Sequence, residues 1–187
     1  MTMGDQNAPV PSRPLEDTLP LIESLLKQVI RFGGFELKFV ISKRAPGGEQ
    51  FETPEYVVDF SGADADLLVE KNGTLLDSLE YLVLKAVRLE EDRYTKITID
   101  SRGWRRLRAE ELKLTARVAA ERVIETGDAF PLNPMSPRER RIVHLALRDQ
   151  PQVRTESEGT GPERKVVILS ASPSPVRRPS PPFRKRR

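Results

Sequence analysis

Cysteine is absent from this 187-residue sequence, and histidine occurs only once, at His144. Disulfide scaffolds and cysteine-based zinc sites are therefore excluded, and one chain cannot assemble a metal site from several histidines. No apolar run approaches the roughly 20 residues of a membrane span, and no signal peptide is recognisable. We therefore expect a cytoplasmic protein that does not insert into membranes.

Common catalytic motifs are missing as well. The sequence has no Gly-x-x-x-x-Gly-Lys phosphate loop and no Gly-x-Ser-x-Gly nucleophile elbow. We expect a protein that is not an enzyme and that needs no cofactor and no metal. A nuclease that uses His144 as a general base stays open as a minor alternative.

The net charge of +3 is distributed unevenly along the chain. Residues 13–101 carry 11 Lys and Arg against 17 Asp and Glu, whereas residues 102–148 carry 11 against 6. Residues 171–187 carry 6 positive residues and no acidic ones. A polyanion should therefore be attracted to the second half of the chain and to its end, and repelled by the first half.

The first half shows helical and strand patterns in turn. Helical spacing predicts a helix over 15–32, and alternation predicts strands over 35–41 and 56–60, joined by a loop over 43–54. Two helices that are divided near Gly73 and a strand over 95–100 complete the order α-β-β-α-α-β. Residues 1–14 contain few large apolar residues and are expected to be disordered.

A long helix is predicted over residues 103–126, with two rows of apolar side chains. The rows are Leu107, Leu114 and Val118, and Leu112, Ala116, Ala119 and Val123. A short strand over 129–132, a further helix, and a hairpin made by 153–156 and 164–169 should follow. Residues 171–187, rich in Ser, Pro and Arg, are expected to be a disordered basic tail.

The helix before that hairpin has a sharp start signal. Ser136 and Glu139 have capping-box spacing, and Pro137 falls at the first helical position. The helix should therefore begin at Ser136.

One face of this helix is basic. Arg140, His144 and Arg148 recur every four residues, and Arg141 lies beside them. Guanidinium and imidazole groups of this kind suit an anionic backbone. Two simpler interpretations stay open: the arginines are an ordinary solvated surface, and His144 is a packed histidine.

The run from Asn133 to His144, centred on Arg140-x-x-x-His144, resembles the motif of the R-three-H domain, a module that binds single-stranded nucleic acid. The form is similar to that of the bacterial Jag (SpoIIIJ-associated) family, in which a KH domain precedes it. The resemblance implies an α+β fold, with a type II KH domain over 15–101 and a small α/β R-three-H domain over 102–170.

The segment 67–82 resembles the KH domain of the same family. A KH domain clamps a nucleic-acid backbone with a Gly-x-x-Gly loop. Lys71, Asn72 and Gly73 are the corresponding candidates here, but Glu70 stands where the first glycine is expected. A carboxylate adds bulk and like charge at a phosphate site, so RNA binding by this loop is in question.

Arginines also gather in the first turns of the long helix, where the helix dipole disfavours cations: Arg105, Arg106 and Arg108. They are therefore not present for helix stability. Two interpretations stay open for them, a solvated basic face and an extension of the nucleic-acid surface.

The resemblance implies a single-stranded RNA-binding protein, with single-stranded DNA as an alternative ligand. Arg140, Arg141 and Arg148 would contact phosphates, and His144 would stack on a base or donate to a phosphate. It further implies post-transcriptional regulation linked to cell elongation or division, and a small single-KH-domain protein as partner. The alternative is a protein–protein adaptor with a vestigial KH domain.

Overall fold

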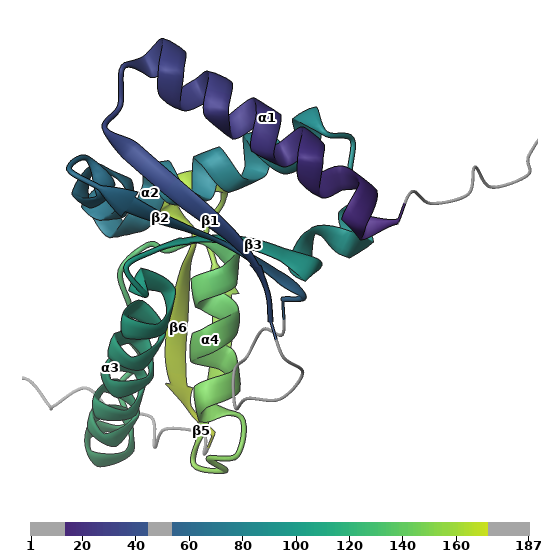
Figure 1. Cartoon of the computed structure of the whole chain (residues 1–187). Coiled ribbons are helices and arrows are strands. Elements are labelled where there is room, and N and C mark those ends of the chain that lie inside the picture. Colours follow the sequence, from purple (N-terminus) through teal and green to yellow (C-terminus); the bar gives the residue numbers. More distant parts are fainter. Residues whose placement is uncertain (1–13, 45–53, 172–187) are drawn as a thin grey trace, which may run out of the picture. The chain divides into compact units, whose positions relative to one another are not determined.

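The computed structural model describes residues 14–44 and 54–171. Helices and strands follow one another in the order α1, β1, β2, α2, β3, α3, β4, α4, β5, β6, with short 3₁₀ helices at Glu91–Lys96 and Gly161–Glu163 (Figure 1). They form two compact units, one up to Arg106 and one from Leu107. The predictions for residues 1–13 and 172–187, and for most of the loop over 43–54, lie outside the described residues.

The sheet of the first unit has three strands: β1 (Leu37–Lys43), β2 (Tyr56–Gly62) and β3 (Ile97–Ser101). β1 is antiparallel to β2, with Phe39 opposite Phe60, and β2 is parallel to β3, with Val58 opposite Ile99. Along β2, Val58 and Phe60 are buried while Asp59 between them is exposed. This alternation shows that one face of the sheet carries the core.

Two helices supply the other side of that core: α1 (Leu15–Gly33) and α2 (Ala65–Ala86). Ile22 and Leu26 of α1 and Leu76 of α2 are fully buried. Gly34 ends α1 in the left-handed conformation (φ 68°), and its N–H donates to the Ile30 carbonyl, so the predicted end of this helix is confirmed. The predicted break is confirmed too, because the backbone of α2 is non-helical over residues 70–73.

The second unit contains most of α3 (Trp104–Thr126), then β4 (Phe130–Pro131), α4 (Pro137–Leu147), β5 (Val153–Glu158) and β6 (Lys165–Ser170). Its antiparallel sheet has the order β4-β6-β5. The predicted hairpin is confirmed, with Thr155 opposite Ile168. Ala116 and Val123 of α3, Val143 of α4 and Ile168 of β6 are fully buried and form the core of this unit.

The chain is therefore a mixed α and β protein, as predicted. Of the helices in the described ranges, none is long and apolar enough to cross a membrane. The two apolar rows of α3 differ in burial. Leu112 and Ala116 are buried, whereas Leu107 and Leu114 are exposed.

Candidate nucleic-acid interface

Helix α4 begins where the sequence predicts. The Glu139 N–H donates to Ser136 Oγ at 3.3 Å, and the Ser136 N–H donates to Glu139 Oε2 at 2.8 Å, so the capping box is confirmed. Pro137 occupies the first helical position. The capping box satisfies two backbone N–H groups that have no partner within the helix. The start of α4, and with it the position of its basic face, is therefore fixed.

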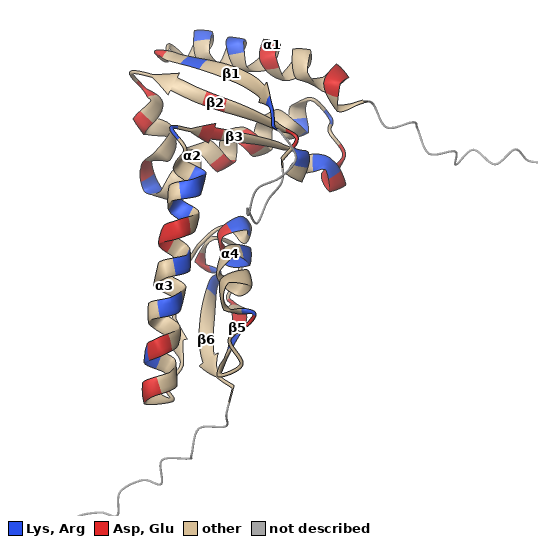
Figure 2. Cartoon of the chain, turned by 60° about the horizontal axis from the view of Figure 1, so that its bottom comes forward, with Lys and Arg blue, Asp and Glu red and all other residues tan. Residues whose placement is uncertain are grey.

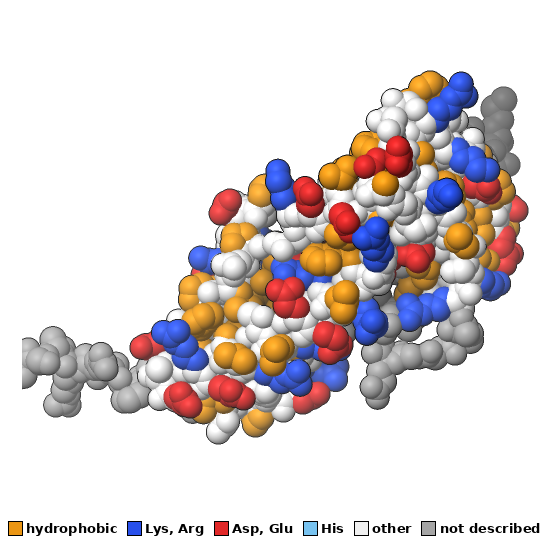
Figure 3. Space-filling view, turned by 60° about the vertical axis from the view of Figure 1, so that its left-hand side comes forward, with side chains coloured by type: hydrophobic (Ala, Val, Ile, Leu, Met, Phe, Trp, Pro, Cys, Tyr) orange, Lys and Arg blue, Asp and Glu red, His pale blue; other side chains and the backbone are white. Residues whose placement is uncertain are grey.

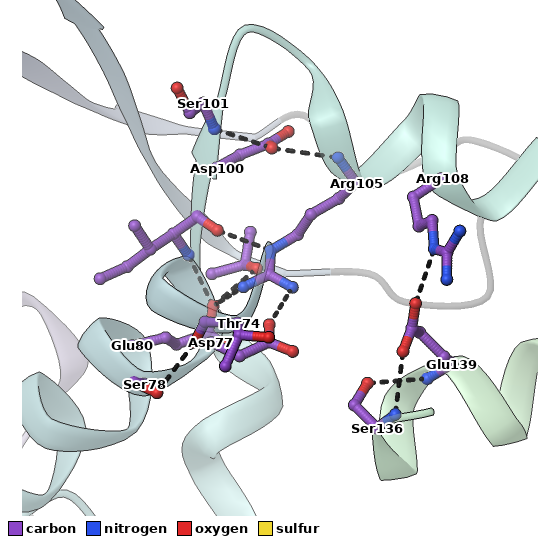
Figure 4. Close-up of polar contacts among 12 residues, drawn as sticks. Thr74, Asp77, Ser78, Glu80, Asp100, Ser101, Arg105, Arg108, Ser136 and Glu139 are labelled. Atoms are coloured by element: carbon purple, nitrogen blue, oxygen red, sulfur yellow. Dashed lines mark hydrogen bonds and ion pairs between the residues drawn. The ribbon is translucent and has the colours of Figure 1, made fainter. Parts of the chain in front are cut away.

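Arg108 of α3 reinforces this helix start. Its Nε donates to Glu139 Oε1 at 2.7 Å (Figure 4). Its Nη1 donates to Glu111 Oε2 at 2.9 Å. The side chains of Arg108 and Glu139 are only 16% and 12% exposed. Burial opposes the charge of Arg108, but the hydrogen bonds to the two carboxylates raise its pKa above the ordinary value. Arg108 therefore joins α3 to α4.

His144 faces β5 rather than open solvent. Its Nδ1 lies 2.6 Å from Thr155 Oγ1, and its Nε2 lies 2.9 Å from Ser157 Oγ. The ring is half-buried, and burial, followed by the charge of Arg140, lowers the pKa of His144 below its ordinary value. Because each ring nitrogen has a hydroxyl partner, donation to a phosphate would require one of these two bonds to break.

Arg140 carries a charge that no carboxylate neutralises in the described part of the chain. Its Nη1 donates to the neutral hydroxyl of Ser157 at 3.2 Å, and its Nε is buried without a partner. Burial, followed by the charge of Arg164, lowers the pKa of Arg140 below its ordinary value. A guanidinium that bonds a neutral hydroxyl and lies beside a second cation is suited to an anionic ligand.

Two further basic residues, Arg141 of α4 and Arg148 directly after its end, are open to solvent. Arg141 is exposed and makes no ion pair with any described residue. Arg148 Nε lies 3.2 Å from Asp149 Oδ1, with both side chains largely exposed. Such an exposed pair contributes little and yields readily to a phosphate. Arg141 and Arg148 are seven residues apart, which is about two helical turns, so both lie on the same side of the helix.

The loop inside α2 has an unusual backbone. Lys71, Asn72 and Gly73 all adopt the left-handed conformation, with φ of 49°, 60° and 71°. Lys71 and Asn72 are exposed, as is Glu70, but Gly73 is buried. A Cβ at Gly73 would lie 2.5 Å from Nε1 of Trp104. Packing against Trp104 is therefore sufficient to require glycine at this position.

Arg105 has internal partners, which argue against its predicted place on the nucleic-acid surface. Its Nε donates to the Ile99 carbonyl at 2.6 Å, its Nη1 to Asp77 at 2.9 Å and its Nη2 to Glu80 at 3.0 Å (Figure 4). The side chains of Arg105 and Glu80 are 16% and 12% exposed. Three of its donors thus join α3 to α2 and β3 within the first unit, and are not available to RNA.

Arg106, the neighbour of Arg105, is exposed. It makes no ion pair with any residue of the described ranges and remains a candidate for ligand contact. Across those same ranges, no group of three or more His, Asp or Glu side chains is placed to hold a metal ion.

The second unit matches a known domain family. Residues 110–170 match the family model of the R-three-H domain. They are an R-three-H domain. A protein of Clostridium symbiosum named RNA-binding protein KhpB is 39% identical over 114 residues, which cover 61% of this chain and 51% of that protein. The protein of the same name from Bacillus subtilis strain 168 is 34% identical over 110 residues, 58% of this chain and 53% of that protein. The chain thus matches about half the length of these relatives.

The R-three-H domain includes α4 and the hairpin of β5 and β6, and so contains all four basic-face residues predicted from the sequence. Arg105, Arg106 and the loop of α2 lie outside the matched residues. Sequence reasoning did not identify Thr155, Ser157 and Arg164. Thr155 and Ser157 alternate along β5 and therefore point to the same face. The alternation of Thr155 and Ser157 is visible in the sequence, but the sequence does not show that His144 lies against these two hydroxyls.

Proposed function

We propose that the R-three-H domain of this chain binds single-stranded RNA through α4 and the adjacent face of β5. The observation that carries the proposal is the position of Arg140, whose charge is compensated by no carboxylate among the described residues and whose Nε has no partner there. The match to the R-three-H family and the relatives that carry the name RNA-binding protein support the same conclusion.

Within this interface the basic residues have different roles. Arg141 and Arg148 are exposed and reach phosphates as charged donors, and Arg140 supplies a fixed guanidinium next to Ser157. His144 bonds the hydroxyls of Thr155 and Ser157, the second of which also bonds Arg140, so only the face of its ring is left for a base. Phosphate contacts of this kind make binding dependent on salt, because each neutralised phosphate releases counterions.

We propose that the first unit is a KH domain whose loop binds RNA weakly. The order α1, β1, β2, two halves of α2, and β3 is the order that the resemblance implies. Lys71 and Asn72 favour an anion, but Glu70 is exposed beside them and Gly73 faces Trp104. The acidic balance of residues 13–101 opposes a polyanion further.

At the level of the cell, we propose a post-transcriptional regulator that acts in the cytoplasm and affects cell elongation or division. A small single-KH-domain protein is the proposed partner. These roles rest on the resemblance to the Jag family, and the name of the relatives, RNA-binding protein KhpB, supports the RNA-binding part alone. A protein that works by binding RNA needs no catalytic group, and we propose no enzymatic activity.

A protein–protein adaptor is the second candidate, favoured by one observation. In the first unit, two residues that could have contacted RNA instead contact other parts of the same unit. Arg105 bonds Asp77 and Glu80, and Gly73 packs against Trp104. The first unit would then dock a protein.

Crosslinking in cells, followed by sequencing of the RNA recovered with the protein, tests the proposal. We expect RNA above the level of a mock purification, and less RNA from the Arg140→Ala/Arg141→Ala variant. Arg44→Ala is the matched control, because it removes an exposed positive charge of the first unit that makes no ion pair with the described residues. Recovery no higher than the mock sample would favour the adaptor.

A further inference from the structure

Helix α3 carries apolar side chains on two opposite faces. Ala116 and Val123 are fully buried in the core of the second unit. On the opposite face Leu107, Leu114 and Val118 are 55%, 58% and 57% exposed. At 3.6 residues per turn, spacings of seven and four place these three side chains in one row along the helix.

This row, which we call the α3 seam, has the pattern of a helix-pairing surface. Single exposed apolar residues are ordinary, but three on one side of a helix form a row that can face a partner. The positions between them and beside them are charged, including Glu110, Glu111 and Arg117. Figure 2 shows acidic and basic residues along α3. Figure 3 shows hydrophobic side chains among charged ones on the side of the molecule that it brings forward.

We propose that the α3 seam pairs with the α3 seam of a second copy of this chain, the two helices running antiparallel about a twofold axis. In that arrangement Leu107 of one copy lies near Val118 of the other, and the twofold axis repeats the contact. The two Leu114 side chains pack between these pairs. The apolar stripe is therefore covered along its whole length by its own repeat.

The charges beside the seam fit this partner. Glu110 and Arg117 lie seven residues apart on the same flank of the helix, so in an antiparallel pair Arg117 of each copy lies beside Glu110 of the other. Arg117 is exposed and makes no ion pair with the described residues of its own chain. Glu110 pairs with Lys113 at 2.6 Å, but its side chain is 58% exposed, and such a pair rearranges at little cost.

The length of the seam sets the strength of the association. At 1.5 Å per residue the segment from Leu107 to Val118 spans roughly 17 Å, or about three turns. A pair of helices that short buries less surface than a stable protein interface does, so the dimer is weak and reversible. The seam lies on α3 and uses none of the residues proposed to bind RNA.

Sedimentation equilibrium of the full chain over a roughly hundredfold concentration range tests the proposal. We expect a monomer–dimer equilibrium whose dissociation constant weakens at least about tenfold in Leu114→Glu. Ile124→Glu is the matched control, since Ile124 is also an exposed apolar residue of α3 but lies off the seam. It should leave the equilibrium unchanged. A monomer at every concentration, or a dimer that Leu114→Glu does not weaken, would overturn the proposal.

Charge reversal supplies a second readout that does not depend on removing apolar surface. Arg117→Glu places like charges beside Glu110 of the partner copy, and Glu110→Arg places like charges beside Arg117, so each variant alone should be monomeric. An equimolar mixture of the two restores opposite charges on both sides and should form a heterodimer. If the mixture associates no more than the separate variants do, the antiparallel arrangement is wrong. Circular dichroism of each variant confirms that the fold is intact.

Discussion

The Nε of Arg108 lies 2.7 Å from Oε1 of Glu139, and the other oxygen of that carboxylate accepts the N–H of Ser136. One carboxylate thus starts α4 and joins it to α3. The orientation of the basic face of α4 within the R-three-H domain depends on this contact, although neither residue belongs to the face itself.

Arg108→Ala should lower the free energy of unfolding by about 1–3 kcal/mol, because Glu139 is left with part of its charge unpaired in a site that is largely closed to water. Urea unfolding measures the change. Thr115→Ala, an exposed substitution on the same helix, should stay within about 0.5 kcal/mol of the wild type. Equal stability of Arg108→Ala and the wild type would show that the ion pair contributes nothing.

Arg105→Ala should destabilise the protein without weakening RNA binding by the folded form. Its removal leaves the buried carboxylate of Glu80 with fewer donors, and loss of one partner of a buried pair costs about 3–5 kcal/mol at most. Urea unfolding and RNA titration at a temperature where the variant is folded separate the two effects. A variant of wild-type stability that loses affinity would restore Arg105 to the RNA surface.

The stability of the protein should depend on pH through His144. Burial and the charge of Arg140 lower its pKa below the ordinary value of 6.5, so the unfolded chain binds this proton more readily than the folded protein does. The stabilisation is therefore complete above about pH 6.5 and is lost as the pH falls below it.

Urea unfolding at a series of pH values measures this effect. In His144→Gln the side-chain amide can still bond both hydroxyls of β5 but does not titrate, so the pH dependence of its unfolding free energy should be flatter below about pH 6.5. Parallel curves for the two proteins would contradict the assigned pKa shift.

Glu70→Gly should strengthen RNA binding by the loop of α2. The effect is measured in the Arg140→Ala/Arg141→Ala background, so that the basic face of α4 does not mask it. Glu70→Gln removes the charge but keeps the size of the side chain, and therefore separates repulsion from steric exclusion. No gain in either variant would mean that Glu70 points away from the path of the RNA.

Local features of this chain were predictable from its sequence. The capping box of Ser136 and Glu139, the stop at Gly34 and the break before Gly73 each depend on residues that are close in sequence, and all three are confirmed. The hairpin of β5 and β6 likewise follows from local alternation. Signals of this kind can be recognised without knowing which distant residues pack against them in the fold.

Non-local features were not predictable. Arg105 looks like any other exposed arginine until Asp77 and Glu80 are brought beside it, and these lie 28 and 25 residues earlier in the chain. The two hydroxyl partners of His144 come from β5. The two rows of α3 are both apolar in sequence, and only the fold decides that Leu112 is buried and Leu114 is exposed.

The most direct test of the proposed function is a titration of a short single-stranded RNA with the wild type and with Arg140→Ala/Arg141→Ala at several salt concentrations. We expect the variant to bind at least about tenfold more weakly, and the slope of log affinity against log salt to fall by about 0.7 for each phosphate that the variant no longer neutralises. Arg44→Ala should keep the wild-type affinity and slope. A folded double variant with the affinity and the salt slope of the wild type would contradict the account.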